Sequence, residues 1–256
     1  MSKNRFSIDR VSRRQILAFI SGTAAVSLAG CLRKQSVAVE PTPVAQLTQN
    51  NAVQNAPPNC IVRPEQTEGP YFVDEKLNRS DIRSNPADGA TKSGVPLRLV
   101  FQVSQLQNQA CTPLRGATID VWHCDAEGAY SDVQDRNSST IGQKFLRGYQ
   151  VTDANGTAQF TTIYPGWYPG RTVHIHFKIR TDSTAQQSYE FTSQLYFDDA
   201  ITDQVHQQQP YATNGQRRQR NDRDGIFQQG GDQLLLALSK DDQGYTGTFQ
   251  IGLQTA

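Results

Sequence analysis

The tripeptide His174-Ile175-His176 holds two of the four histidines in this chain. Residues two apart on a β-strand share a face, so the two imidazoles would project together and could converge on one metal ion. Val173, Ile175 and Phe177 would then face the core. A solvated strand face carrying two incidental histidines has the same pattern, so the tripeptide alone leaves both interpretations open.

Two tyrosines favour the interpretation as a metal site. Tyr168 lies in a turn rich in Pro and Gly just before the histidine strand and could fold back over its face, and Tyr130 follows the end of another predicted strand. A phenolate is a hard anionic ligand, and with a pKa of about 10 it ionises at neutral pH only beside a strong Lewis acid. Two Tyr and two His suit ferric iron, although any one of the nine tyrosines could simply be a packed or surface aromatic.

The elements that must position these residues are mostly strands. Alternating apolar residues predict short strands bounded by turn signals such as Asn155-Gly156, and only 199–209, ended by Pro210, has a helical pattern. We therefore expect a mainly β fold, a single β-sandwich domain with long loops and little helix. The predicted strands are 97–103, 117–123, 148–151, 158–163, 171–179, 191–197, and a final hairpin of 234–238 with 245–253.

The first thirty residues have the composition of an export signal: a basic start, an apolar stretch and small residues at its end. Arg13-Arg14 indicates the twin-arginine route, and Leu28-Ala29-Gly30-Cys31 is typical of a lipoprotein cleavage site with Cys31 lipidated. An ordinary signal peptide with a Cys there by chance is the alternative. We expect a signal over 1–30, a disordered tether over 31–58, and a folded domain over 59–256 of a membrane-anchored lipoprotein on the periplasmic or extracellular side.

Net charge and cysteine content predict which partners and which disulfides the protein can have. The whole chain carries a net +1 and the signal +4, which leaves −3 for the remainder, so a nucleic-acid partner is not expected. Beyond Cys31 the chain has Cys60, Cys111 and Cys124, which predicts one disulfide and one buried thiol without choosing the pair. His123 is interpreted as structural, and His206, among glutamines, as solvated.

Five blocks, in order, resemble the intradiol ring-cleavage dioxygenases, the non-haem ferric family of catechol 1,2- and protocatechuate 3,4-dioxygenases. The resemblance covers most of residues 60–253 and implies a β-sandwich with iron between sheet and loops. The blocks are Thr67-Glu68-Gly69-Pro70-Tyr71, the stretch from Val121 to Ser131, Phe145-Leu146-Arg147-Gly148 with Thr152-Asp153, the stretch from Tyr168 to His176, and Gln194-Leu195-Tyr196-Phe197.

The resemblance implies one Fe(3+) per chain. Tyr130 and His174 would be its equatorial ligands, and Tyr168 and His176 its axial ligands. Tyr168 would also act as the catalytic base that takes a proton from the bound substrate.

The resemblance also implies a catechol-type substrate and O₂ as partners, with the ring cleaved between its two hydroxyl carbons to give a cis,cis-muconate-type diacid. Arg171 would offset charge on the substrate ring, and Gln194 would lie near the reacting diol. Gly69, Pro70 and Tyr71 would form a wall over the aromatic ring.

One departure concerns specificity. Only Pro169 and Gly170 separate Tyr168 from Arg171, whereas the soluble members carry a longer loop there, so we expect a more open site as in an exported, stand-alone branch. The preferred catechol and the oligomeric state stay open. The alternatives are a non-catalytic aromatic- or metal-binding sandwich module of the cell envelope, and a cupin-type metalloenzyme, which is disfavoured because no suitably placed Glu follows His176.

Overall fold

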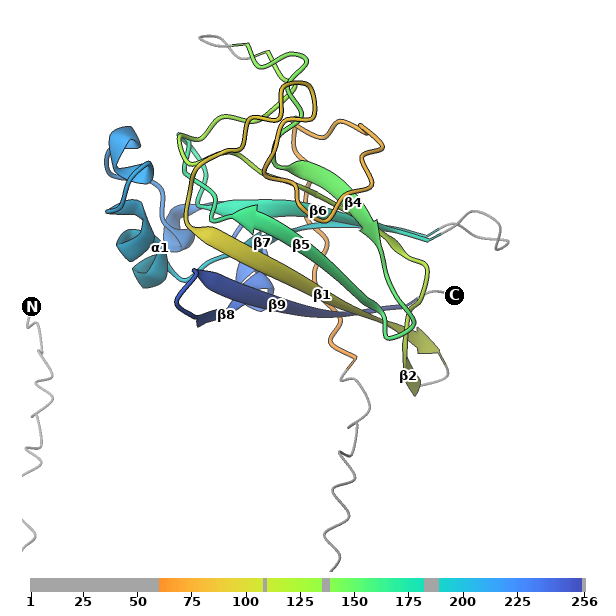
Figure 1. Cartoon of the computed structure of the whole chain (residues 1–256). Helices are drawn as coiled ribbons and strands as arrows, with labels where there is room; N and C mark the ends of the chain where they lie inside the picture. The colour runs from red at the N-terminus through yellow and green to blue at the C-terminus, as the bar shows by residue number, and fades with distance from the viewer. Residues whose placement is uncertain (1–59, 108–109, 135–138, 182–188, 255–256) are drawn as a thin grey trace, which may run out of the picture. The chain divides into compact units, whose positions relative to one another are not determined.

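Two β-sheets packed face to face form the framework of the described part of the chain (Figure 1). The computed structural model describes residues 60–107, 110–134, 139–181 and 189–254. The mainly β sandwich with little helix is confirmed. The predicted signal, Cys31 and the tether lie outside the described residues. No helix in the described part is long and apolar enough to cross a membrane.

The first sheet is built around its longest strand, β1. This strand pairs antiparallel with β2 and β5 and parallel with β9, which in turn pairs with β8. Leu97, Leu99, Phe101 and Val103 alternate along β1 and are buried, as the period-two pattern predicts. The strands are β1 (Pro96–Gln107), β2 (Ala110–Pro113), β5 (Thr157–Ile163), β8 (Ala237–Lys240) and β9 (Tyr245–Leu253).

The second sheet carries the histidines. Its strands are all antiparallel, in the order β4 (Arg147–Val151), β3 (Thr118–Trp122), β6 (His174–Arg180) and β7 (Glu190–Tyr196). On the inner face of β6, the Phe177 ring lies 5.3 Å from that of Phe101 and 5.4 Å from that of Phe249, which joins the two sheets. His174 and His176 point the other way, but they are buried under loops, so the solvated-face interpretation is wrong.

Most predicted strands match to within one residue, but β1 extends to Gln107, β2 was not predicted, and three other elements differ by two residues or more. The strand predicted over 171–179 begins at His174, so Arg171 lies in the loop before it. The helix predicted over 199–209 is α1 (Asp199–His206), whose N-terminus is capped by Asp198. The strand predicted over 234–238 begins later, as β8, because Gly231–Leu234 forms a 3-10 turn. Further 3-10 turns among the described residues are Tyr211–Asn214 and Asn221–Arg223.

An extended segment at the start of the described chain crosses from one sheet to the other (orange in Figure 1). It begins against β9, where Gly252 N–H donates to the Ile61 carbonyl at 2.8 Å, and reaches β7, where Gln66 N–H donates to the Thr192 carbonyl at 3.0 Å. Residues 66–72, called the strap below, continue across the histidine face.

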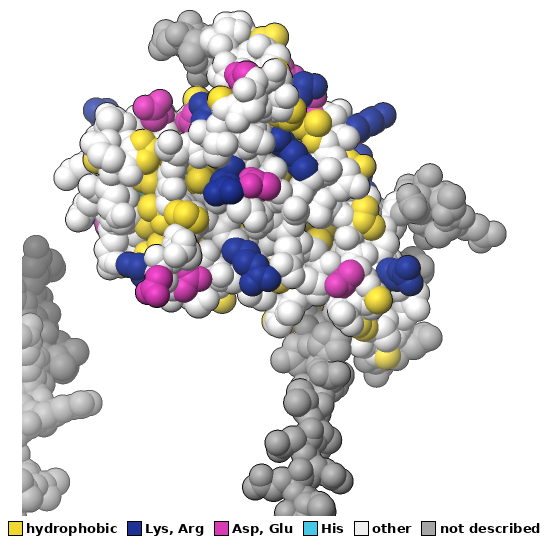
Figure 2. All heavy atoms as spheres, in the orientation of Figure 1, with side chains coloured by type: hydrophobic (Ala, Val, Ile, Leu, Met, Phe, Trp, Pro, Cys, Tyr) yellow, Lys and Arg dark blue, Asp and Glu magenta, His cyan; other side chains and the backbone are white. Residues whose placement is uncertain are grey.

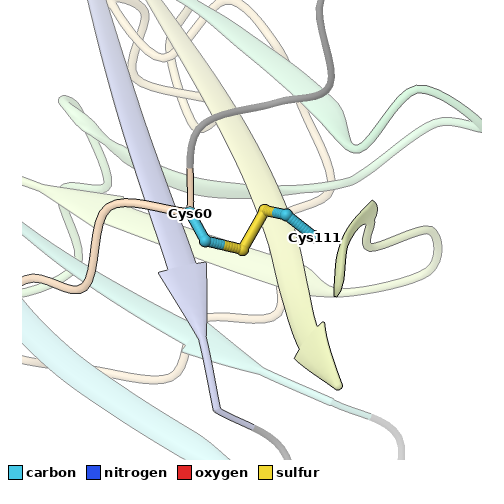
Figure 3. The surroundings of a disulfide bond; sticks show 2 residues. All are labelled: Cys60 and Cys111. Atoms are coloured by element: carbon cyan, nitrogen blue, oxygen red, sulfur yellow. A yellow bond between two sulfur atoms is a disulfide. The ribbon is translucent and has the colours of Figure 1, made fainter. Parts of the chain in front are cut away.

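A disulfide ties down the start of this segment. Cys60 is bonded to Cys111 of β2, with Cα atoms 5.6 Å apart (Figure 3), and Cys124 is a buried free thiol. This confirms one disulfide with one buried thiol and identifies the pair.

All four histidines of the chain are buried, and none shows on the face drawn in Figure 2, where acidic and basic side chains are interspersed. His123 is structural as predicted, with Nε2 2.7 Å from Thr162 Oγ1. The prediction of a solvated His206 is wrong: its ring stacks on Tyr211 at 5.1 Å and its Nε2 donates to the Pro165 carbonyl at 3.1 Å. The last turn of α1 is folded against the loop before Tyr168, and sequence composition gave no sign of that contact.

Candidate metal centre

Four side chains predicted as ligands meet at one point above the second sheet. His174 Nε2 lies 3.0 Å from His176 Nε2, 3.1 Å from Tyr168 Oη and 3.4 Å from Tyr130 Oη. β6 supplies both imidazoles, and the loops after β3 and before β6 supply the phenols. The structure therefore brings together all four donor atoms from three separate stretches of the sequence.

His174 is oriented by the backbone. Its Nδ1 donates to the Thr172 carbonyl at 2.6 Å, and because a carbonyl can only accept, the neutral ring presents the Nε2 lone pair to the other donors. Burial, together with the positive charge of Arg171, lowers the pKa of His174 to about 3. The ring is therefore neutral at physiological pH and available as a ligand.

His176 is held by packing. Its ring stacks on Trp122 at 5.1 Å with the planes 7° apart, and its Nδ1 has no hydrogen-bond partner among the described residues. Burial lowers the pKa of His176 well below its ordinary value. Gly69 of the strap closes the other side, where a Cβ would lie 3.2 Å from His176 Cε1.

The tyrosines form an aromatic wall. Tyr130 stacks on Tyr71 of the strap at 4.4 Å, and the Tyr168 ring lies edge-on to both, 5.7 Å from Tyr130 and 6.3 Å from Tyr71. Burial raises the pKa of both phenols, and at Tyr130 the neighbouring Tyr168 adds to the effect. Neither phenol ionises at neutral pH unless a cation stabilises it.

The donor set fits a trivalent metal ion. Two atoms that each lie about 2.1 Å from one ion are about 3.0 Å apart at a right angle and about 3.4 Å apart at the tetrahedral angle. The separations around His174 Nε2 fall in this range. Without a metal, His176 Nε2 can carry a proton and donate it to the His174 Nε2 lone pair, and a bound cation would take the place of that proton. No group of three or more His, Cys, Asp or Glu among the described residues is placed to hold a metal, so a metal bound at this point would need the tyrosines as ligands.

Beside the donors lies a chain of hydrogen bonds. Arg171 Nη2 donates to Gln194 Oε1 at 2.6 Å, and Gln194 Nε2 donates to the Thr67 carbonyl of the strap at 2.9 Å. At the other end of the guanidinium, Nε donates to Asp224 Oδ2 at 2.8 Å. Burial disfavours the charge on Arg171, but the hydrogen bond and charge of Asp224 outweigh burial and raise its pKa.

Asp224 is itself buried, with an exposed fraction of 1%. Burial alone would raise the pKa of this carboxyl, but the hydrogen bonds that it accepts from Phe227 N–H, Thr172 N–H and Arg171 hold the pKa below its ordinary value. The carboxylate is therefore ionised at neutral pH and pairs with the guanidinium.

Most of the predicted site residues lie at this centre. Pro70 is exposed, between Gly69 and Tyr71, both of which contact ligand side chains. Sequence reasoning missed Trp122 and Asp224, which touch the predicted residues without belonging to a metal or catalytic pattern. Trp122 lies directly opposite His176 in the β3–β6 pairing, a register that could have drawn attention to it.

The sequence matches a protein-family model described as Dioxygenase over residues 67–222, more than half of the chain. The fold also resembles a solved structure titled intradiol ring-cleavage dioxygenase from Tetranychus urticae, with 30% identity and a TM-score of 0.67, covering 76% of this chain and 95% of that one. This chain belongs to the intradiol ring-cleavage dioxygenase family.

Other members of the family are more distant or match over shorter stretches. The dioxygenase domain of a carbohydrate-binding fusion protein from Streptomyces sp. SirexAA-E is 28% identical, with a TM-score of 0.53, covering 77% of this chain and all of that domain. The protocatechuate 3,4-dioxygenase beta chain of Burkholderia cepacia is 31% identical over 117 residues, 42% of this chain and 48% of its own length. This intradiol family chain thus spans about half the length, or less, of the curated relatives it matches first.

Proposed function

We propose that this chain is a non-haem dioxygenase with one Fe(3+), which uses O₂ to cleave a catechol-type ring between its two hydroxyl carbons and gives a cis,cis-muconate-type diacid. The observation that carries the proposal is the convergence of two neutral imidazoles and two phenols on one point beside a partly buried arginine. When bound, ferric iron would supply the Lewis acidity that holds both catechol oxygens and makes the ring reactive toward O₂.

The two tyrosines have different parts in this proposal. Tyr130 is 4% exposed and stacked against Tyr71, which suits a permanent ligand. Tyr168 is partly exposed and comes from the short turn before β6. It is therefore the phenol free to change position, and its Oη would hold the proton that a substrate hydroxyl loses on binding.

The remaining residues bind and orient the ring. Arg171 directs its N–H groups toward negative charge that develops on the substrate. Gln194 fixes one end of that guanidinium from β7. Tyr71, on the strap and beside both phenols, would form part of a wall over the substrate ring.

The test is a visible spectrum of purified protein loaded with ferric iron, before and after catechol is added without O₂. Phenolate-to-iron charge transfer should give a red-brown colour that shifts with catechol, and admission of O₂ should yield a muconate. Tyr168→Phe should retain iron but lose most turnover and part of the colour, whereas the control Tyr149→Phe, on β4 away from the donors, should match the wild type. A colourless protein at full iron loading would refute the ligand assignment, and colour without turnover would favour a binding module.

The cellular location is proposed on the sequence alone. The twin-arginine pattern and Cys31 support export and lipid anchoring on the outer side of the cytoplasmic membrane. Export of the folded protein would let iron be loaded in the cytoplasm. A radiolabelled fatty acid supplied to the cells should label the wild-type protein but not Cys31→Ala, and an unlabelled wild type would contradict the anchor.

A further inference from the structure

Each carboxylate oxygen of Asp224 accepts two hydrogen bonds. Oδ2 accepts from Arg171 Nε at 2.8 Å and from Thr172 N–H at 2.7 Å, and Oδ1 accepts from the N–H groups of Ile226 and Phe227, both at 2.9 Å. The carboxylate is therefore fixed by its own loop and cannot rotate away from Arg171. It hydrogen-bonds none of the four donor side chains, so the contacts that link it to the site run through its neighbours.

The first neighbour is the guanidinium. A guanidinium is planar and has five N–H donors, so two hydrogen bonds to acceptors on different elements set its plane and leave other donors for a substrate. For Arg171 these acceptors are Asp224, on the loop after the 3-10 turn Asn221–Arg223, and Gln194, on β7. Because Asp224 and Arg171 together carry no net charge, Arg171 would act on a substrate mainly through the direction of its remaining N–H groups.

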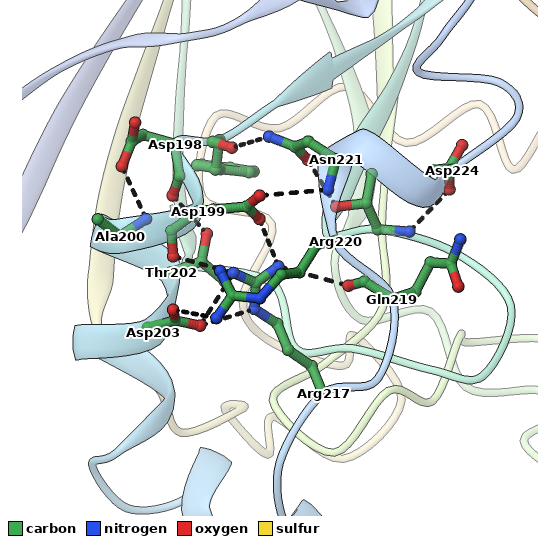
Figure 4. A network of polar contacts seen from close by, with 12 residues as sticks. Asp198, Asp199, Ala200, Thr202, Asp203, Arg217, Gln219, Arg220, Asn221 and Asp224 are labelled. Atoms are coloured by element: carbon green, nitrogen blue, oxygen red, sulfur yellow. Dashed lines mark hydrogen bonds and ion pairs between the residues drawn. The ribbon is translucent and has the colours of Figure 1, made fainter. Parts of the chain in front are cut away.

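The second neighbour is the Thr172 backbone. Its N–H donates to Asp224, while its carbonyl accepts from His174 Nδ1 at 2.6 Å. Asn221 holds the same residue from the side, since its Oδ1 accepts from Thr172 Oγ1 at 2.6 Å and its Nδ2 donates to the Phe197 carbonyl at 2.8 Å. Figure 4 shows Asn221 and Asp224 in one polar network with Asp199 of α1, so this turn is anchored to the rest of the fold.

We infer that Asp224 is a positioning residue for ring cleavage: it sets the plane of the Arg171 guanidinium, and the hydrogen bond from Thr172 N–H helps to hold its carboxylate in place. The inference rests on the proposed function for its kinetic consequence. It adds a residue that lies beyond the matched family region, which ends at residue 222.

The test is a double-mutant cycle of Asp224→Asn with Arg171→Ala, with Asp222→Asn as the matched control. Asp222 is exposed and belongs to the same turn, so its substitution makes the same chemical change away from Arg171. The measurements are iron content, the visible spectrum, kcat/KM for catechol, and the dissociation constant of 4-nitrocatechol from an anaerobic optical titration.

Asp224→Asn should retain iron and lower kcat/KM by about 10- to 100-fold, as removal of a residue that orients a ligand typically does. In the Arg171→Ala background the same substitution should cost about twofold or less, because the group through which it acts is gone. The weakening of 4-nitrocatechol binding should follow the same pattern, and Asp222→Asn should match the wild type.

Equal losses in both backgrounds would overturn the inference, because a general structural role does not depend on Arg171. Should Asp224→Asn be insoluble, Asp224→Glu retains the charge but displaces the carboxylate by one methylene, and the same cycle decides the question. Failure of the proposed function looks different: the wild type would bind iron without cleaving catechol, and the 4-nitrocatechol arm of the cycle would still test Asp224.

Discussion

Gly69→Ala is expected to disturb the metal centre through a single added methyl group. Gly69 lies on the strap with a φ of +72°, and a Cβ there would lie 3.2 Å from His176 Cε1 and 3.6 Å from His176 Nε2. The substitution therefore has two separable effects, backbone strain and pressure on a predicted ligand.

The free-energy cost of the backbone strain follows from the positive φ. An alanine in the left-handed region costs about 1–2 kcal/mol, whatever surrounds it. The contact adds a displacement: 3.2 Å is tight for a Cβ, so the imidazole must give way by a few tenths of an ångström. Metal sites tolerate deviations of about 0.2 Å, so we expect iron affinity or turnover to fall on the order of 10- to 100-fold.

Gly89→Ala is the matched control. Gly89 has the same φ of +72° and no atom within 4 Å of the position its Cβ would take. Both variants should lose about 1–2 kcal/mol in urea unfolding of the iron-free protein. Only Gly69→Ala should lower iron affinity, measured by competition with a chelator, and shift the charge-transfer band.

The reasoning is refuted if the two variants bind iron with equal affinity and show wild-type spectra. That result would mean that the strap does not press on His176 in solution. A loss of iron in both variants would mean that backbone strain alone causes the effect, and the contact with His176 would then not explain it.

Three further predictions concern residues around the site. The buried Lys178 ammonium pairs with Glu68 and lies 4.3 Å from the centre of the Phe72 ring, and both of these residues belong to the strap. Lys178→Met removes these contacts with the strap, so KM for catechol should rise several-fold while iron content stays unchanged. Loss of iron instead would mean that the lysine supports the ligands directly. Burial lowers the pKa of His123 to about 4 from 6.5, so the unfolded state binds the proton first and the stability from this group is lost as pH falls below 6.5. Its share between pH 7 and 5 is about 2 kcal/mol, and His123→Gln should flatten the pH dependence of urea unfolding by that amount; an unchanged slope would contradict the shift. The disulfide spans 51 residues, so replacing both Cys60 and Cys111 by Ser should lower the free energy of unfolding by about 4 kcal/mol, and a loss under about 1 kcal/mol would show that the strand pairing suffices without it.

The sandwich and the meeting of the donors were predictable because they follow from short-range rules. The alternation along β6 places His174 and His176 on one face whatever the rest of the chain does, and the turn before the strand is too short to carry Tyr168 far away. The strand face and its donor atoms could therefore be inferred from spacing, Tyr130 could be inferred from its place after another predicted strand, and the resemblance gave each donor its role.

The supporting contacts were out of reach because they join distant parts of the chain. Asp224 lies 53 residues from Arg171, and nothing in its local sequence separates it from other aspartates. His206 looked solvated among polar neighbours, but tertiary packing against Tyr211 buries it. Arg171 was assigned to the strand because its neighbours alternate, whereas its hydrogen bond to Asp224 holds it in the loop.

The position of the disulfide has a mechanical consequence. A pull on the chain before Cys60 would pass through the Cys60–Cys111 bond into β1 and β2, and through the Ile61 and Arg63 hydrogen bonds into β9. The strap begins only at Gln66, beyond these attachments, so the first sheet would bear the force before it reached Gly69 or Tyr71. If the protein is anchored through Cys31, as proposed, movement of the anchor need not disturb the geometry of the metal centre.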